Sequence, residues 1–372
     1  MVSPARILFT IPNFITAGSG RVMFNILERL DRNKFLPSIC VLRRGGKLDA
    51  EVERLGIPLL ELPFTVDAKP YWSLLERSRR AAEVFRPYRF NLWHSFHYAG
   101  EYTEPIIARF AGARAWVYTK KAMGWGSRAW KIRSLLATRI VADNSDMLRV
   151  MFDRPRFARK VKVIHHGIPA DQYAPTDKRL ALRKHLGIGS RQIVVTCVAH
   201  LLPVKGQTTL IEALSQMPDG HLLLAGMPLD VEYVHALHAQ VKKHGLEGRV
   251  HFLGAVADVP ALLSETDVFV LPTWAKWRME GCPVALLEAM SCACACIATD
   301  IPGSRDLIEH GKSGLLVPAQ DSRTLAAALR RLVASPEERT AFGIAARERV
   351  IDRFTIEHEV AAHEQMYSEL LG

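Results

Sequence analysis

The sequence predicts an α/β protein made of two doubly wound domains, and three observations lead to this. A chain of 372 residues is too long for one ordinary hydrophobic core. Short apolar runs alternate with helical patterns throughout, which is typical of parallel sheets covered by helices on both faces. The pattern restarts near Gln192, after a polar stretch over 175–191. We therefore expect a first domain over 1–180, a second over 181–354, and a helix over 355–372 that crosses back onto the first domain.

The expected strands are short apolar runs that polar or turn residues interrupt. In the first half they lie at 5–12, 35–44, 91–96, 115–120, 138–145 and 160–168. In the second half they lie at 192–200, 220–227, 249–255, 267–273, 294–300 and 314–318. Amphipathic stretches between them, at 21–30, 206–217, 283–290 and 324–334, predict helices.

Composition excludes several classes of protein. No run of about 18 apolar residues occurs, so no transmembrane helix is expected. The first residues, MVSPARILFTIPNF, have too short an apolar core for a signal peptide and read better as a first buried strand. Six cysteines without the spacing of a disulfide scaffold indicate free thiols in a reducing cytoplasm.

Charge is distributed unevenly along the chain. Residues 1–185 hold 33 Lys and Arg against 16 Asp and Glu, whereas 186–372 hold 16 against 22. This asymmetry predicts an anionic partner for the first half. Nucleic acid is not expected, because no helix-turn-helix, zinc-finger or aromatic RNA-binding motif accompanies the charge. An anionic membrane surface or an acidic lipid-linked substrate fits better, although a merely basic surface is the simpler alternative.

Two strand ends carry groups suited to phosphate. Gly18, Ser19 and Gly20 follow the first strand and lead into a helix, where backbone amides can approach an anion closely. This is not the G-x-G-x-x-G fingerprint, which argues against a nicotinamide enzyme. After the strand at 192–200, His200, Lys205 and Gly206 lie in the loop before the next helix. Lys205 suits a diphosphate, although a lone loop lysine is more often simply solvated.

The segment MEGCPVALLEAM, residues 279–290, places two carboxylates around the start of a helix. Pro283 suits the first helical position, so Glu280 precedes the helix and Glu288 lies near its second turn. Carboxylates here favour a neutral polyol, because they accept hydrogen bonds from its hydroxyls, while the backbone of Gly281, Cys282, Pro283 and Val284 binds other groups.

Four cysteines lie in or near this segment, and zinc binding is the alternative to packing. Zinc needs paired ligands such as C-x-x-C with a matching second pair. Cys292, Cys294 and Cys296 instead alternate with alanine into an expected strand, so they share one face. Packing in a buried strand is the better interpretation, and we expect no metal site.

These motifs together resemble the family 4 retaining glycosyltransferases of GT-B architecture, along nearly the whole chain and most strongly in its second half. The family's glutamate–seven residues–glutamate motif matches Glu280 and Glu288, its glycine-rich loop matches 18–20, and its loop Lys-Gly matches Lys205 and Gly206. The resemblance implies two Rossmann-like domains with an interdomain cleft that holds a nucleotide sugar. It implies that Glu288 binds the ribose and that Glu280 lies beside the transferred sugar.

The chain departs from the family pattern at several positions. His200 stands where an arginine is common, which removes a permanent charge from the diphosphate site. The family often has His-x-His after its fourth strand, and LWHSFHYAG offers His94 and His97 with Phe96 at the usual second position. We expect only one of the two histidines to serve in catalysis, with a slight preference for His94. His166 replaces a frequent asparagine.

The resemblance implies a metal-independent retaining glycosyltransferase without a cofactor. The second domain would bind the nucleotide-sugar donor, and the basic first domain a saccharide, lipid-linked or lipopolysaccharide acceptor. The enzyme would be cytoplasmic and peripheral on the inner face of the membrane. Two alternatives stay open: a sugar-nucleotide 2-epimerase of the same architecture, and a non-catalytic nucleotide-sugar-binding protein.

Overall fold

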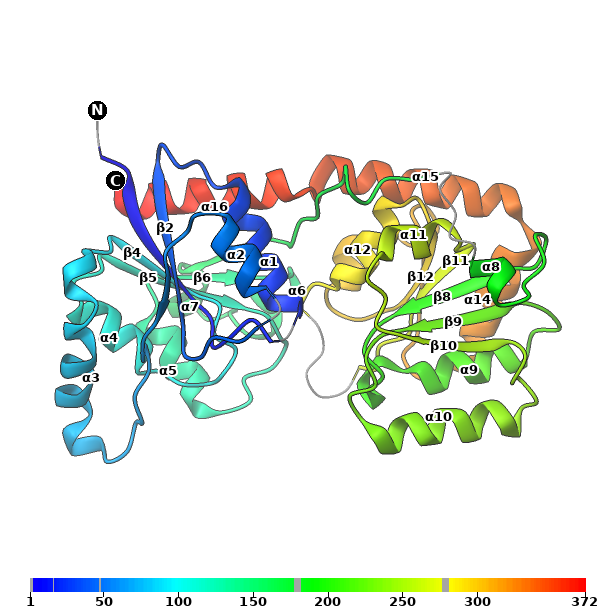
Figure 1. Ribbon diagram of the computed structural model, residues 1–372, viewed down its shortest axis with the longest axis horizontal. Helices are drawn as coiled ribbons and strands as arrows, with labels where there is room; N and C mark the ends of the chain where they lie inside the picture. The colour runs from blue at the N-terminus through cyan, green and yellow to red at the C-terminus, as the bar shows by residue number, and fades with distance from the viewer. Residues whose placement is uncertain (1–2, 16, 47, 177–181, 276–280) are drawn as a thin grey trace. The chain divides into compact units, whose positions relative to one another are not determined.

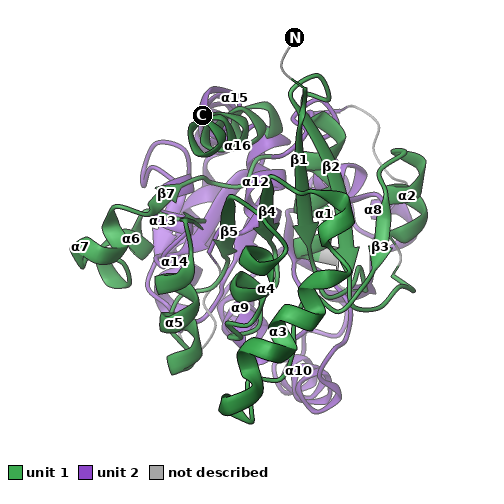
Figure 2. Cartoon of the chain, turned by 90° about the vertical axis from the view of Figure 1, so that its left-hand side faces the viewer, with its two compact units in different colours: residues 1–167, 356–372 green, residues 168–355 purple. Residues whose placement is uncertain are grey.

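The structure is a computed structural model that describes residues 3–15, 17–46, 48–176, 182–275 and 281–372 (Figure 1). The chain divides into two compact units, the first comprising 1–167 with 356–372 and the second 168–355 (Figure 2). The first unit therefore ends at Gly167, earlier than the boundary after 180 that the sequence predicted. A backbone reason is visible, since Ile168 already forms a bridge with Thr355 of the second unit.

Unit 1 is built on a seven-stranded parallel sheet of order β3-β2-β1-β4-β5-β6-β7. Its strands are β1 (Ala5–Thr10), β2 (Phe35–Val41), β3 (Leu59–Glu61), β4 (Leu92–Ser95), β5 (Ala115–Lys120), β6 (Arg139–Ala142) and β7 (Val161–Val163). Six of them were predicted from the sequence. The edge strand β3 was not, because three residues are too few to show a pattern.

The helices of unit 1 connect these strands and are mostly short. They are α1 (Ala17–Arg29), α2 (Asp49–Arg54), α3 (Leu74–Glu83), α4 (Glu104–Phe110), α5 (Arg128–Leu136), α6 (Asp146–Val150) and α7 (Pro155–Ala158), with 3-10 turns η1 (Tyr71–Ser73) and η2 (Arg86–Tyr88). The last helix of the chain, α16 (Ile356–Leu371), also belongs to this unit and packs against α1. A hydrogen bond of 2.7 Å joins the ring of His94 in β4 to the hydroxyl of Tyr367 in α16.

Unit 2 holds a six-stranded parallel sheet of order β10-β9-β8-β11-β12-β13. Its strands are β8 (Val194–Val198), β9 (His221–Ala225), β10 (Val250–Gly254), β11 (Val268–Leu271), β12 (Ala295–Thr299) and β13 (Leu315–Val317). Its helices are α8 (Leu182–His185), α9 (Gln207–Ser215), α10 (Val231–Lys243), α11 (Val259–Ser264), α12 (Val284–Ser291), α13 (Ser304–Leu307), α14 (Ser322–Ala334) and α15 (Pro336–Arg353), with the 3-10 turn η3 (Pro203–Lys205). All six strands were predicted, and the prediction of two doubly wound parallel sheets is confirmed.

The central strands are apolar because helices cover both faces of each sheet. Every residue of β5, β9 and β12 is buried, as expected for strands in the middle of a two-sided core. Cys292, Cys294 and Cys296 belong to one apolar cluster of unit 2, between β12 and helices α12 and α15, and all carry free thiols. Burial raises the pKa of each of these thiols, so they stay protonated and apolar.

Candidate functional site

In unit 2, the loops that follow neighbouring strands β8 and β11 meet at the carboxyl edge of the sheet. Gly206, after β8, has a positive φ of 71°, and a Cβ there would lie 2.0 Å from the carbonyl oxygen of Pro272, after β11. The backbone N–H of Trp274 donates to the Val204 carbonyl at 2.8 Å. Only glycine therefore fits between the two loops. Open parallel sheets bind ligands at the carboxyl edge where the strand order reverses, as it does here between β8 and β11.

A third loop joins the same edge. Gly303 follows β12, has a φ of 86°, and would place a Cβ 2.4 Å from the carbonyl oxygen of Gly281. Gly281 precedes α12, so the start of that helix is held against the loop after β12. Helix α12 itself begins at Val284, one residue later than predicted, because Pro283 has an extended ψ of 98°. The first amides of α12 have no partners within the helix, which leaves them able to bind an anion.

Burial shifts the pKa values of Lys205 and Glu288. Burial lowers the pKa of the Lys205 ammonium to about 8, and the neighbouring Cys197 opposes this only in part. Burial raises the pKa of Glu288 to about 7, while a hydrogen bond with Tyr173 opposes the shift. Shifted groups at the ligand edge of a sheet are typical of functional sites. Glu280, the other carboxylate of the predicted motif, lies outside the described residues.

His200 lies on the surface of the same loop. Loss of hydration lowers its pKa first, and the charge of Lys205 lowers it further. At neutral pH the ring is therefore mostly neutral, unlike the arginine found in this position of the family. Lys205 thus carries the principal positive charge of this loop.

In unit 1, the glycine-rich segment lies inside a helix and not in a turn before it. Helix α1 already begins at Ala17, so Gly18, Ser19 and Gly20 form its first turn. A side chain at Gly20 would lie 2.9 Å from the ring of Phe14, so packing also explains a small residue there. The amides of a first turn lack intrahelical partners, and the predicted anion contact is still sterically open.

The two histidines of unit 1 differ in their surroundings. His94 is fully buried in β4, and both ring nitrogens are occupied, one by Tyr367 at 2.7 Å and the other by Thr119 at 2.9 Å. Burial lowers its pKa well below the usual value, so the ring is neutral. His97 lies beyond the end of β4, and its Nδ1 has no hydrogen-bond partner although the residue is only 7% exposed. Of the two, His97 has a ring nitrogen left for a ligand.

Glu104 and Arg133 form a buried network that the sequence did not reveal. Both side chains are fully buried, and the Arg133 guanidinium donates to Glu104 Oε2 at 2.9 Å and to Glu101 Oε1 at 2.8 Å. The Oε1 atom of Glu104 accepts from the Trp93 indole at 3.1 Å and from the hydroxyl of Thr10. The network thus ties the carboxyl ends of β1 and β4 to α4 and α5.

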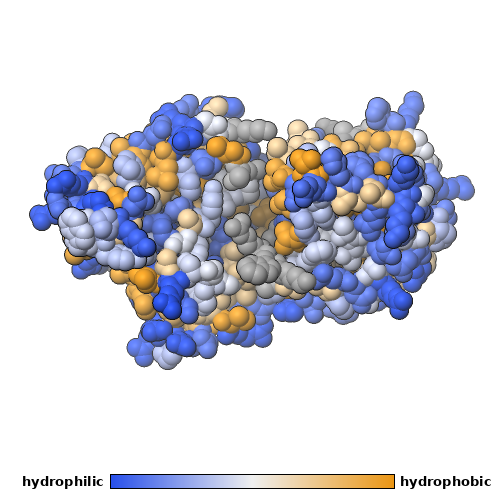
Figure 3. All heavy atoms as spheres, turned by 90° about the horizontal axis from the view of Figure 1, so that it is seen from below, coloured by the Kyte–Doolittle hydropathy of each residue, from blue (hydrophilic) through white to orange (hydrophobic). Residues whose placement is uncertain are grey.

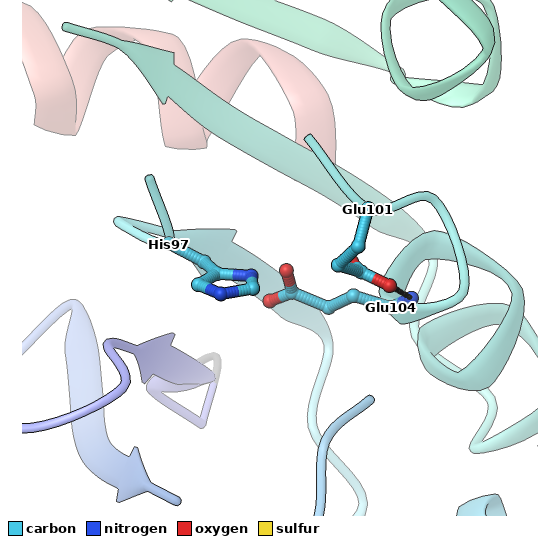
Figure 4. Close-up of side chains that lie close together, drawn as sticks. All are labelled: His97, Glu101 and Glu104. Carbon is cyan, nitrogen blue, oxygen red and sulfur yellow. Dashed lines mark hydrogen bonds between the residues drawn. The ribbon is translucent and has the colours of Figure 1, made fainter. Parts of the chain in front are cut away.

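His97, Glu101 and Glu104 lie close enough together to suggest a metal site (Figure 4). Among the described parts of the chain, this is the one group of three or more possible metal ligands. However, Arg133 already supplies a cation to both carboxylates, and hydrogen-bond donors occupy both oxygens of Glu104. A divalent ion would have to displace the guanidinium into the protein interior. The residues present therefore fit a network organised around Arg133 better than a metal site.

The basic residues over 120–133 divide between core and surface, with Arg128 and Lys131 exposed and Lys120 and Arg133 buried. Lys120 is 2% exposed, with its Nζ 4.4 Å from the ring centre of Trp130, and Arg133 is wholly buried. Trp125 packs edge-on against Phe152 in the core. No helix in the described residues is both long enough and apolar enough to cross a bilayer.

Comparison with known proteins agrees with this geometry. Residues 178–349 match the family model of glycosyl transferases group 1. The GDP-mannose-dependent alpha-(1-6)-phosphatidylinositol monomannoside mannosyltransferase of Mycolicibacterium smegmatis is 28% identical over 268 residues, 67% of this chain and 68% of the relative. The UDP-Gal:alpha-D-GlcNAc-diphosphoundecaprenol alpha-1,3-galactosyltransferase of Escherichia coli is 24% identical over 387 residues, 96% of this chain and 95% of the relative.

Solved structures show the same architecture. Anabaena HepE in complex with UDP and glucose superposes with a TM-score of 0.82 at 23% identity, covering 98% of this chain and all of that one. This likeness confirms the GT-B fold expected from the sequence. Together with the family match in unit 2 and the relative that aligns along nearly the whole chain, it leads to one conclusion: this chain belongs to the glycosyl transferases group 1 family of glycosyltransferases.

Proposed function

We propose that this protein transfers a sugar from a nucleotide-sugar donor to a lipid-linked or lipopolysaccharide-type acceptor, with retention of anomeric configuration. The observation that carries the proposal is the pair Lys205 and Glu288, a cation and a carboxyl with displaced pKa values in the unit that matches the family. Relatives named for GDP-mannose and UDP-galactose support a nucleotide sugar as donor.

In the proposed complex, the donor lies at the carboxyl edge of unit 2. Lys205 and the first amides of α12 offset charge on the diphosphate as the bond between sugar and phosphate breaks, so the proposal requires no divalent metal. Ionised Glu288 accepts hydrogen bonds from donor hydroxyls. The role of Glu280 beside the transferred sugar stays a prediction from the sequence, and in unit 1 the histidine role passes to His97, because His94 has both nitrogens occupied.

Titration calorimetry with UDP- and GDP-sugars tests the donor site. We expect Lys205→Ala and Glu288→Gln each to weaken donor binding by roughly tenfold, since each removes one charge-assisted hydrogen bond. Lys312→Ala is the matched control, an exposed lysine of the same unit. Unchanged affinity in both site variants would reject this location for the donor.

A membrane contact of unit 1 is the second part of the proposal. Tyr71, Trp72 and Leu75 are 64%, 87% and 62% exposed on η1 and α3, and Arg79 and Arg80 on α3 are also exposed. Large apolar side chains beside basic ones suit the interface of an anionic bilayer. The face in Figure 3 likewise shows apolar patches beside strongly hydrophilic surface within one unit. We therefore place the enzyme at the inner, cytoplasmic face of the membrane.

Co-sedimentation with liposomes tests this contact. We expect binding to vesicles that contain phosphatidylglycerol but not to purely phosphatidylcholine vesicles, with weakening as salt rises. Trp72→Ala and Arg79→Gln should each reduce the bound fraction, whereas Arg191→Gln, an exposed arginine of unit 2, should not. Equal partition of the wild-type protein to both vesicle types would contradict the contact.

A further inference from the structure

A cavity of about 680 Å³ opens at the carboxyl edge of the unit 1 sheet. Its wall comes from Leu42 after β2, from 65–68 after β3, and from His97 and 99–103 after β4, with Ala129 of α5. Its volume is within the range of small-molecule sites, and its place is where parallel sheets bind ligands. If the proposed function holds, this cavity lies in the unit that receives the acceptor.

The ionisable side chains of the wall are acidic or neutral. Asp67 and Glu101 line the cavity, and none of the described residues of the wall is a lysine or an arginine. This contrasts with the composition of the same half of the chain, in which basic residues outnumber acidic ones about two to one. A phosphate in the cavity would therefore meet the carboxylates of Asp67 and Glu101, and no described lysine or arginine of the wall itself would offset its charge.

Two arginines that do not line the cavity reach its wall residues: Arg77 donates to the Asp67 carbonyl at 2.7 Å, and Arg133 donates to the Glu101 carboxylate at 2.8 Å. The Arg133 side chain is fully buried and donates to Glu101, to Glu104 and to the hydroxyl of Ser95. The Glu101 side chain remains 22% exposed, with Oε1 bound to Arg133 and Oε2 accepting from the Thr103 amide at 2.7 Å. Two carboxylates thus share one guanidinium, which leaves the network with a net negative charge.

His97 adds a neutral hydrogen-bonding group to this wall. Its ring packs edge-on against Phe64 at 5.8 Å between centres, while Nδ1 is buried without a partner. Burial, together with the charge of Arg133, lowers the pKa of His97 to about 4. The ring is therefore uncharged at neutral pH. A buried polar atom without a partner is costly, so a ligand hydroxyl that pairs with Nδ1 is favoured.

We infer that this cavity binds an uncharged sugar ring of the acceptor and disfavours a phosphate or carboxylate at that position. Hydroxyls of the ring donate to Glu101, and one hydroxyl pairs with Nδ1 of His97. Any acidic group of the acceptor, such as a lipid-linked diphosphate, is then held outside the cavity, where the basic surface of unit 1 lies. The identification of the bound sugar as part of the acceptor rests on the proposed function. The cavity's preference for neutral sugars can be measured without any donor.

The test is a titration of the full-length protein, labelled with ¹³C at the histidine rings, with two sets of probes. The neutral set is methyl α-D-mannoside, methyl α-D-glucoside and methyl α-D-galactoside, and the acidic set is the corresponding 6-phosphates. The His97 signal is assigned by its loss in His97→Asn. We expect neutral glycosides to shift this signal and the 6-phosphates to bind at least tenfold more weakly.

Variants sharpen the assignment. Glu101→Gln should weaken glycoside binding by roughly fivefold and narrow the discrimination against the 6-phosphates, because it removes the charge but keeps the shape. Glu83→Gln, an exposed glutamate on α3, is the matched control and should behave as the wild type. Circular dichroism establishes that each variant is folded, and the wild-type preference needs no variant at all.

Equal or tighter binding of the 6-phosphates would overturn the inference. So would glycosides that leave the His97 signal unmoved at about 100 mM, which is about the weakest sugar binding worth testing. Calorimetry with UDP- and GDP-sugars on the same sample separates the two proposals. Glycosides that move the His97 signal in a protein that binds no nucleotide sugar would support the cavity and reject the proposed function. A protein that binds nucleotide sugars but prefers the 6-phosphates in the cavity would support the proposed function and reject the inference about the cavity.

Discussion

Replacing His166 by asparagine removes the cation of a buried cluster that holds α16 on unit 1. Its Nε2 lies 3.2 Å from Asp143, its Nδ1 lies 3.0 Å from Glu359 of α16, and all three side chains are buried. Glu359 also accepts from the backbone N–H of Gly167 at 2.8 Å, at the point where the chain leaves the unit. Asparagine has a similar reach but no charge, so Asp143 and Glu359 would lose the cation that contacts them both.

The size of the effect follows from the pKa of His166. Burial alone would lower it, but the charge of Asp143 and the hydrogen bonds to Asp143 and Glu359 raise it from 6.5 to about 10. The difference corresponds to roughly 5 kcal/mol of stabilisation while the ring is protonated. Because the folded-state pKa is the higher one, this contribution is fully present below about pH 6.5 and is lost as pH rises toward about 10.

Lys121 opposes this trend, so the wild-type protein alone is a poor test. Burial lowers the pKa of Lys121 to about 7, while Asp143 and Glu359 raise it in part. Its contribution to stability therefore grows with pH over much of the same range. The difference between wild type and His166→Asn removes most of this background. We expect that difference to be about 3–5 kcal/mol at pH 6 and to shrink by up to about 1.4 kcal/mol per pH unit above pH 6.5.

Urea unfolding followed by tryptophan fluorescence measures this difference in stability. The fluorescence reports on unit 1, because five tryptophans lie there: Trp72, Trp93, Trp116, Trp125 and Trp130. His358→Asn, an exposed histidine on the same helix, is the control and should change stability by less than about 0.5 kcal/mol. A His166→Asn deficit that stays constant from pH 6 to pH 9 would refute the assignment of the charge to His166.

Three further predictions concern unit 2. Donor affinity should be greatest between about pH 7 and 8 in calorimetry, because Glu288 loses its charge below about 7 and Lys205 above about 8; a flat profile from pH 6 to 9 would argue against both roles. Gly206→Ala should cost at least about 1–2 kcal/mol in urea unfolding, because its positive φ is strained for alanine and a Cβ would meet a carbonyl oxygen. Gly248→Ala, with open space around the Cβ, should cost far less, and equal losses would show that the loop contact is unimportant. Cys296→Ala should lower stability by about 1 kcal/mol through lost packing. The packing interpretation would be contradicted if the wild-type protein contained stoichiometric zinc and this variant did not.

Local patterns predicted most of the fold. Twelve of the thirteen strands follow apolar runs in the sequence, because buried parallel strands are continuously hydrophobic. The exception, β3, is a three-residue edge strand whose partners are set by β2 and not by its own sequence. The boundary at Gly167 also escaped prediction, since it depends on where α16 returns along the chain.

The candidate site was predictable only in part. Loop residues at strand ends, such as Lys205 and Gly206, follow from strand positions, so the sequence placed them at the correct edge. The sequence did not indicate which histidine has a ring nitrogen left for a ligand, because this depends on Tyr367 and Thr119, which occupy both nitrogens of His94. The burial of Arg133 could not be predicted from local sequence, because it depends on the carboxylates of Glu101 and Glu104, 32 and 29 residues away. A possible signal was its position in an amphipathic segment rich in tryptophan.

Transfer itself is the most direct measurement of the central claim. The protein is incubated with a radiolabelled nucleotide sugar and a detergent-dispersed lipid-linked saccharide, and the product is extracted and its anomeric configuration read by NMR. The account predicts label in the lipid product only when acceptor is present, with the configuration of the donor and with loss of the signal in Glu288→Gln. An epimerised nucleotide sugar formed without acceptor, or an inverted linkage in the product, would contradict it.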